Sequence, residues 1–327
     1  MKAGIWMHVL QDAGTNPSRI QESLKRLKEA NFCLIIPCVK NMDGLLDYHS
    51  KVGKVRDIFE RWDPLRAVCE SAAKLNMKVH PWLCVFTERE NSAIVESNPG
   101  LKAVDRGGQI SDMWMCAMRP EVQDYEYSLY KEIMENYPVD GVHLDYIRAG
   151  LVCHCEYCQA VVKKKTGMAL KDITARENGE EYETWMNWRE SRITDFVTRV
   201  SKKAKELGKE ISAAVFAGYP SSVEFEGQNW KDWSDKKLVD YMMPMTYTDN
   251  LVMLQGYTGI HKAITGDNLQ LWEGIGRRSS MSHLSHKQLE NQIRSLQEMN
   301  VEGVVIFSYK GLEETDFEIF KKYFTQD

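Results

Sequence analysis

Short, densely apolar segments alternate along the chain with longer segments in which apolar residues recur every three or four positions. Residues 3–9 have the dense pattern and predict a strand, and Asn16-Pro17 then begins a helix, because Asn caps a helix and Pro fits its first turn. Residues 32–39 are too continuously apolar for a strand with one face in water. We therefore expect a strand covered on both faces, as in a parallel sheet.

The same alternation continues to the C-terminus. It predicts further strands at residues 77–86, 139–146, 211–219, 240–247, 269–275 and 301–309. It also predicts helices at residues 64–75, 120–137 and 185–207, with helical stretches between and after the last strands. Eight strands alternating with helices favour a closed (β/α)8 TIM barrel over an open sheet. Because no composition shift marks a second domain, we expect one barrel domain over residues 1–327, with a cysteine-rich insertion after strand four at about 149–180.

The composition argues against two classes of partner. The chain has 42 Lys and Arg against 47 Asp and Glu, a net charge of −5, so it lacks the basic field that holds nucleic acid. Its apolar runs are far shorter than the 18 or so residues of a membrane span, and no basic-then-apolar leader precedes the first strand. We expect no nucleic-acid or membrane partner and a cytoplasmic location, or a periplasmic or extracellular one if a signal was removed. The sequence does not indicate the oligomeric state.

Polar and aromatic residues collect at the C-terminal strand ends, where barrel enzymes carry their reacting groups. This mixture suits a sugar, because aromatic faces stack on the apolar side of the ring and carboxylates act on the glycosidic oxygen. The expected substrate contacts are Trp6, His8, Asn41, His80, Trp82, His143, Arg148, Tyr247, Trp272 and Tyr309. The same aromatic and imidazole groups could serve ordinary packing. The sequence contains no GxxxxGK[ST] loop, and no GxGxxG follows a strand, so a phosphate or nucleotide site is not indicated.

Asp145 is the leading catalytic candidate. It follows His143 by two positions in the predicted strand 139–146, so both side chains point to the same face, the barrel interior. We expect Asp145 to lie nearest the barrel mouth, with His143 and Arg148 as supports that keep it ionised. A single Asp at a strand end is also a common loop or helix cap.

Three cysteines form a C-x-C-x-x-C cluster just after the fourth strand, at Cys153, Cys155 and Cys158. Eight cysteines are too few for a disulfide scaffold in a chain of this length, whereas this spacing lets three thiolates meet one tetrahedral ion. We expect a structural zinc site with Cys116, from the preceding loop, as fourth ligand and His154 in reserve. The alternative is three reduced surface thiols. No cofactor is expected for catalysis.

Residues 139–148, Val-Asp-Gly-Val-His-Leu-Asp-Tyr-Ile-Arg, resemble strand four of the glycoside hydrolase-like family 10 barrels, which reads D-G-[IV]-H-[FL]-D-Y-x-R. The resemblance extends to residues 115–122, 188–194, 227–230 and 239–247, so it spans most of the barrel. The sequence departs from the family at residues 117–119 and 272–273, which suggests a rim adapted to an unusual ligand near strands three and seven. The resemblance implies glycoside hydrolysis and names no sugar.

A glycosidase of this kind implies two carboxyl groups acting on an oligo- or polysaccharide. Asp249 is the first choice as partner of Asp145, because related glycosidase barrels pair a strand-four nucleophile with a strand-six acid. Glu273 and Glu224 are the alternatives. Carboxyl groups roughly 5–5.5 Å apart imply retention at the anomeric carbon, and roughly 6.5–9.5 Å imply inversion.

Two other functions remain open. The barrel could bind carbohydrate without cleaving it, in which case the aromatic rim is functional and Asp145 does not react. It could instead be a metal-dependent hydrolase in which His8, His80, His143 and Asp145 converge on one ion, although strand one lacks the His-x-His pair that many such barrels use.

Overall fold

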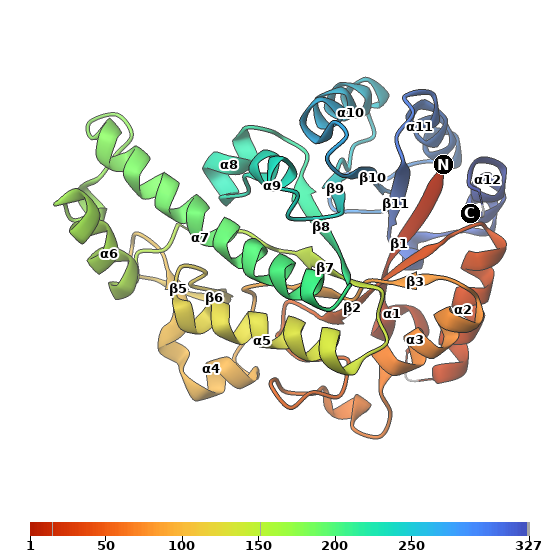
Figure 1. The fold of residues 1–327 in the computed structure, drawn as a ribbon, viewed down its shortest axis with the longest axis horizontal. Helices are drawn as coiled ribbons and strands as arrows, with labels where there is room; N and C mark the ends of the chain where they lie inside the picture. The colour runs from red at the N-terminus through yellow and green to blue at the C-terminus, as the bar shows by residue number, and fades with distance from the viewer. Residues whose placement is uncertain (15, 151, 326–327) are drawn as a thin grey trace.

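The computed structural model describes residues 1–14, 16–150 and 152–325 and confirms the expected closed barrel (Figure 1). The barrel strands are β1 (Lys2–His8), β2 (Leu34–Lys40), β3 (Lys78–Val79) with β4 (Trp82–Cys84), β7 (Gly141–Asp145), β8 (Glu210–Phe216), β9 (Tyr241–Met245), β10 (Gln270–Gly276) and β11 (Gly303–Phe307). Their pairings are parallel, and β1 closes the ring by pairing with both β2 and β11.

The third strand position differs from the expectation of one strand over residues 77–86. Two short strands, β3 and β4, occupy it, with His80 and Pro81 between them. Pro81 has no backbone N–H to donate to a neighbouring strand, which explains the interruption of the ladder. The short β4 nevertheless pairs with β7 so that Cys84 lies beside Asp145.

Helices cover the outside of the barrel (Figure 1). They are α2 (Pro17–Glu29), α3 (Pro64–Lys74), α5 (Pro120–Asn136), α7 (Gly179–Glu206), α9 (Trp230–Asp235), α10 (Leu251–Thr265), α11 (His286–Glu298) and α12 (Glu314–Tyr323). Proline begins α2, α3 and α5, where its fixed φ suits the first turn and its missing N–H costs nothing. The side chain of Asn16 caps α2 by accepting from Ser18 N. No helix in the described part of the chain is long and apolar enough to cross a bilayer.

The cysteine-rich segment stands on one side of the barrel. It contains α6 (Glu156–Thr166), which packs on α7. The helix α6 and one end of α7 project away from the barrel beside an antiparallel hairpin of β5 (Lys102–Val104) and β6 (Ile110–Met115), whereas the rest of α7 packs on α5 and β8 (Figure 1). The helix α7 begins at Gly179, earlier than the expected residue 185. Short helices α1 (Val9–Ala13), α4 (Ala93–Ser97) and α8 (Ser221–Glu226) lie in the loops after β1, β4 and β8.

The strands divide their side chains between two cores, as period-two alternation requires. On β7, Val142 and Leu144 pack outward against the helices, whereas His143 and Asp145 belong to the inward-facing set. Inside the barrel His143 Nδ1 lies 2.8 Å from Ser212 Oγ, and His80 Nδ1 lies 3.0 Å from the same hydroxyl. A buried polar layer therefore separates the two ends of the barrel interior.

Candidate active site

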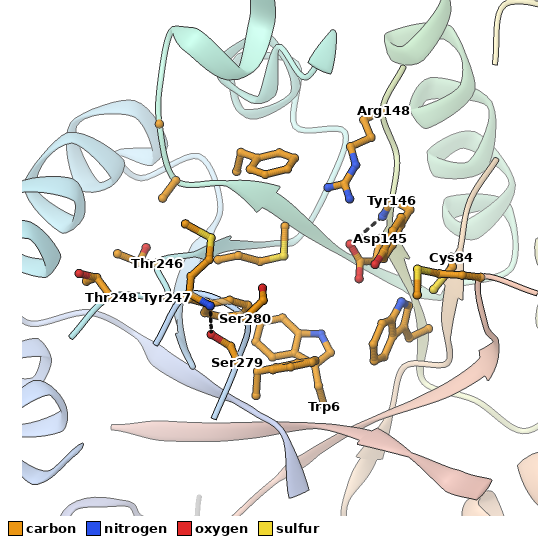
Figure 2. Close-up of a pocket in the computed structure, with 18 of the residues that line it drawn as sticks. Trp6, Cys84, Asp145, Tyr146, Arg148, Thr246, Tyr247, Thr248, Ser279 and Ser280 are labelled. Atoms are coloured by element: carbon orange, nitrogen blue, oxygen red, sulfur yellow. Dashed lines mark hydrogen bonds between the residues drawn. The ribbon is translucent and has the colours of Figure 1, made fainter. Parts of the chain in front are cut away.

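A cavity of about 710 Å³ opens at the C-terminal ends of the barrel strands (Figure 2). Its volume is in the range of small-molecule binding sites, and its position is the one that barrel enzymes use. Of the residues expected at the site, those that line the cavity are Trp6, His8, Asn41, Trp82, Asp145, Arg148 and Tyr247. The first and fourth strands thus deliver side chains to the same cavity.

Asp145 is the last residue of β7 and is buried in the cavity wall. Its Oδ1 accepts a hydrogen bond from Tyr146 N at 2.6 Å. Burial raises the pKa of Asp145 to about 6, although Arg148 and the Tyr146 N–H both act to lower it. Tyr146 itself has φ of 55°, a left-handed conformation that is uncommon for a residue other than glycine and is found often at functional sites. The carboxyl group can therefore hold and release a proton near neutral pH, as a general acid must.

Arg148 lies over Asp145 at the cavity rim (Figure 2). Its guanidinium stands 4.4 Å from the ring centre of Tyr146 and 4.6 Å from that of Phe216. Its Nε lies 3.8 Å from Glu226 Oε2 on α8. These contacts hold a permanent positive charge beside the carboxyl group.

Aromatic side chains form the floor and one side of the cavity. The indole N–H of Trp6 donates to His143 Nε2 at 3.0 Å, which fixes the ring at the cavity floor. The rings of His8 and Trp82 have centroids 4.8 Å apart, and Tyr247 stacks on Phe307 at 5.4 Å. Burial lowers the pKa of His8, with a smaller contribution from Lys310, so this imidazole is neutral at pH 7.

His143 does not play the expected supporting role. Its Nε2 accepts the Trp6 N–H, so its proton lies on Nδ1, which faces Ser212 Oγ. Burial places the pKa of His143 well below the ordinary value, and His80 adds to the shift. His143 is thus a neutral imidazole beneath the cavity, and Arg148 alone of the two expected supports lowers the pKa of Asp145.

Three further residues expected at the rim lie away from the cavity. His80 bonds Ser212 and the Glu210 carboxylate, where β8 begins, so it lies toward the N-terminal end of the barrel. Trp272 packs against Tyr241 with ring centroids 5.4 Å apart, and Tyr241 is the first residue of β9. Tyr309 lies outside the cavity, in a shallow groove beside Lys310. The alternative in which His8, His80, His143 and Asp145 converge on one ion finds no support among the described residues, where the one group of potential metal ligands is the set of four cysteines.

The three candidates for the second carboxyl group also lie outside the cavity lining. Asp249 accepts a hydrogen bond from His283 N at 2.8 Å on the surface, and Glu224 is exposed on α8. Glu273 is fully buried, with Oε1 2.6 Å from His261 Nδ1 and Oε2 accepting from Thr246 Oγ1 at 2.8 Å. Among the described residues, Asp145 is the only carboxylate that lines the cavity.

Several lining residues were missed by sequence reasoning. They are Met42, Cys84, Tyr146, Phe216, Ala217, Gly218, Met245, Thr246, Thr248, Met253, Tyr257, Ser279, Ser280, Met281 and Phe307. Met42, Tyr146, Thr246 and Thr248 directly adjoin predicted site residues in the chain, and this adjacency was an available signal. Cys84, Phe216, Met245 and Phe307 each end a barrel strand. The remaining residues come from loops and from α10, whose positions the hydrophobic pattern does not encode.

A buried ion cluster supports the strand beside Asp145. Lys40 Nζ lies 2.7 Å from Glu88 Oε1 and 2.7 Å from Glu126 Oε1, and it donates to Cys84 O at 2.9 Å. Burial would lower the pKa of Lys40, but the two glutamates raise it above the ordinary value. Burial also raises the pKa of Glu88 to about 7. The cluster therefore holds the end of β4 against the neighbouring Asp145.

The four cysteines expected as metal ligands come together in the structure. The sulfurs of Cys116, Cys153, Cys155 and Cys158 all lie within 4.8 Å of one another and are buried. Cys116 Sγ is 3.5 Å from Cys158 Sγ and 3.7 Å from Cys155 Sγ. A tetrahedral zinc site with Zn–S bonds of about 2.3 Å has sulfurs about 3.8 Å apart, so the arrangement fits. Val104 N also donates to Cys153 Sγ at 3.4 Å, a contact that favours a thiolate.

Comparisons with known proteins agree with this geometry. The sequence profile described as Glycosyl hydrolase-like 10 matches residues 2–262. "Glycosyl hydrolase DigH" of Escherichia coli strain K12 is 26% identical over an alignment 216 residues long, and the match covers 57% of this chain and 46% of that protein. The chain therefore spans about half the length of the curated relatives that it matches.

Solved structures extend the likeness to the whole barrel. The PgaB (BpsB) glycoside hydrolase domain from Bordetella bronchiseptica has a TM-score of 0.78, with 13% identity, and the match covers 100% of this chain and 99% of that one. The α-L-fucosidase isoenzyme 2 from Paenibacillus thiaminolyticus has a TM-score of 0.69, with 13% identity, over 99% of this chain and 49% of that one. At these identities the structures show a shared fold, and the profile that matches most of the sequence shows the family. The chain belongs to the glycosyl hydrolase-like 10 family.

Proposed function

We propose that the protein is a glycoside hydrolase in which Asp145 donates a proton to the oxygen of the bond that breaks. The observation that supports this most directly is the placement of Asp145. It is the one carboxylate in the described cavity lining, and burial raises its pKa to about 6. A carboxyl group with this pKa is protonated in a useful fraction of molecules near neutral pH.

The walls of the cavity are suited to hold a sugar ring beside this acid. Trp6 is fixed at the floor by its bond to His143, and Trp82 and Tyr247 present further aromatic surface. Aromatic faces stack on the apolar side of a sugar, whereas Asn41 and Arg148 provide hydrogen bonds to its hydroxyl groups. We propose a carbohydrate as substrate on these grounds.

The identity of the second reacting group is also a proposal. Glu273 cannot reach substrate from its buried position, and it orients the Thr246 hydroxyl at the cavity wall instead. Asp249 lies two residues beyond Tyr247 and is exposed, so it can turn toward the cavity if its bond to His283 N breaks. We therefore keep Asp249 as the candidate partner and assign Glu273 a positioning role. Because Asp145 is the proposed proton donor, the roles expected from the sequence are exchanged, and Asp249 would act as the base or nucleophile.

A reducing-end assay on a panel of plant and host glycans tests the proposed function. We expect wild-type protein to release reducing ends from at least one glycan or simple glycoside, and Asp145→Asn to lose at least a hundredfold of that rate, since general acid catalysis contributes roughly 10²–10⁴-fold. The matched variant Asp249→Asn changes a second carboxylate of the same rim. Its rate falls comparably if Asp249 reacts and stays within tenfold of wild type if it only caps its loop.

Two results would overturn the proposal. Turnover by Asp145→Asn within tenfold of wild type would remove Asp145 from the reaction. Sugar binding by wild-type protein without release of reducing ends from either glycans or alkyl glycosides would favour a carbohydrate-binding barrel that has lost catalysis.

We also propose that Cys116, Cys153, Cys155 and Cys158 hold a structural zinc ion. Four thiolates close the coordination sphere, so such an ion has no open position for substrate. Its role would be to tie the loop after β7 to the β5–β6 hairpin, which His154 N also joins through Val104 O at 2.7 Å. Elemental analysis of protein produced with zinc tests this, and well under one zinc ion per chain would refute it.

A further inference from the structure

One wall of the cavity is apolar and continues onto the outer surface of the protein. Met245 at the end of β9, Met253 and Tyr257 on α10, and Met281 after β10 form this wall. Met253 is 48% exposed and Met281 is 71% exposed. Large apolar side chains that are both exposed and continuous with a binding cavity mark a contact surface for a ligand.

Three hydroxyl groups on this wall are already engaged within the protein. Thr246 Oγ1 donates to Glu273, and Thr248 Oγ1 accepts from Asn250 N at 3.1 Å. Ser279 Oγ lies 2.9 Å from Ser282 Oγ and accepts from Met281 N at 3.1 Å. A second sugar ring placed here would lose hydrogen bonds to water and gain few from the protein, which is unfavourable.

The part of the lining that comes from other barrel strands has a different character. Asp145 ends β7 and is followed by Arg148, Asn41 follows β2 and His8 ends β1, and these residues offer charged and polar groups. The cavity therefore has a polar half that fits one sugar ring and an apolar half that does not fit another.

The apolar wall is extended along α10. Met253, Tyr257 and Ile260 follow one another at four and three positions, so they share one helix face that leads away from the cavity. An elongated surface of this kind matches a chain better than a compact ring. Methionine, which is flexible and polarisable, suits a ligand that has many conformations.

We propose that the apolar wall is the leaving-group subsite and that the protein cleaves glycosides whose leaving group is an aliphatic alcohol. This inference rests on the proposed glycosidase activity. The bond between the anomeric carbon and the glycosidic oxygen breaks, and that oxygen takes the proton of Asp145. Water supplies the hydroxyl group of the anomeric carbon and returns one proton to the Asp145 carboxylate, so the products are the free sugar and the alcohol.

The test measures binding of n-alkyl glucosides from methyl to octyl by isothermal titration calorimetry, below the concentration at which they form micelles. Affinity should rise about fourfold for each methylene that is buried. The double variant Met253→Gln with Met281→Gln should lower affinity for octyl glucoside at least tenfold and leave methyl glucoside unchanged. The matched control, Ile58→Gln with Ile110→Gln, alters side chains of 47% and 68% exposure outside the cavity lining and should match wild type.

The results separate this inference from the proposed function. If affinity is independent of chain length, or if the Met253 and Met281 variant keeps the chain-length dependence of wild type, the apolar subsite is refuted. In that case the release of reducing ends from a glycan would still support a glycosidase. If chain-length dependence is present but neither glycans nor alkyl glycosides are cleaved, the glycosidase activity is refuted and the proposed leaving group with it.

Discussion

Replacement of Asp145 by Asn should stabilise the protein at neutral pH while it removes activity. The carboxyl group is buried, and its pKa is raised to about 6 from an ordinary value of 3.8. Asn has nearly the same shape, and its Oδ1 can keep the hydrogen bond from Tyr146 N. The substitution therefore removes a buried negative charge without removing the contact that positions the side chain.

The magnitude follows from the difference between the two pKa values. Because the folded state binds the proton more tightly, the protonated form contributes stability below pH 3.8, and this contribution is lost as the pH rises through about 6. A difference of about 2 pH units at 1.36 kcal/mol each gives about 3 kcal/mol at pH 7. For a chain of this length, that corresponds to a rise in melting temperature of about 4 °C.

Urea unfolding of wild type and Asp145→Asn at pH 7 and pH 4 measures this effect. The stability advantage of the variant should be about 3 kcal/mol at pH 7 and nearly absent at pH 4. Asp249→Asn, which makes the same substitution at an exposed site, serves as the control, and it should not reproduce the stability advantage of Asp145→Asn at pH 7 because it removes no buried charge. An advantage that is the same at both pH values, or no advantage at pH 7, would refute the view that burial of an ionisable Asp145 is what tunes this site.

Three other substitutions test the assignments of single residues. Trp82→Ala should weaken sugar binding by about 1 kcal/mol, roughly fivefold, whereas Trp272→Ala should leave binding unchanged and cost about 3–5 kcal/mol of stability, as measured by calorimetry and urea unfolding. Lys40→Met should cost about 3–5 kcal/mol of stability, because it leaves two buried glutamates without their cation. If its effect is no larger than that of the surface variant Lys54→Met, the buried ion cluster does not stabilise the fold. Cys116→Ser should lower the zinc content and the melting temperature together, and full zinc occupancy in this variant would exclude Cys116 as a ligand.

The sequence carried enough information to predict the barrel and part of its site. Alternation of apolar strands and amphipathic helices is a local pattern, and it was sufficient to predict the closed parallel barrel. Likewise, the position of Asp145 on the interior face follows from period-two alternation along one strand. The spacing of Cys153, Cys155 and Cys158 is local in the same sense, and Cys116 was inferred from its place at the same end of the barrel.

The sequence did not show how deep in the barrel interior each inward-facing side chain lies. Trp82 and Trp272 are both inward-facing strand residues, yet one lines the cavity and the other packs near the N-terminal end of the barrel. Which layer a residue occupies depends on the stagger between neighbouring strands and on where each strand begins, and both are properties of the closed sheet. For the same reason, the sequence did not predict that His8 lies at the cavity whereas His80 lies toward the N-terminal end of the barrel.

The sequence by itself determined the fold class, the family motif and the residue types available at the mouth of the barrel. The tertiary structure alone decided the chemical state of Asp145, because its pKa depends on the water excluded by neighbours from several strands and on the nearby charge of Arg148. It also decided that the apolar wall of Met245, Met253 and Met281 lines the same cavity as this acid. These side chains come from a strand, a helix and a loop that are far apart in the chain, and only the closure of the barrel brings them together.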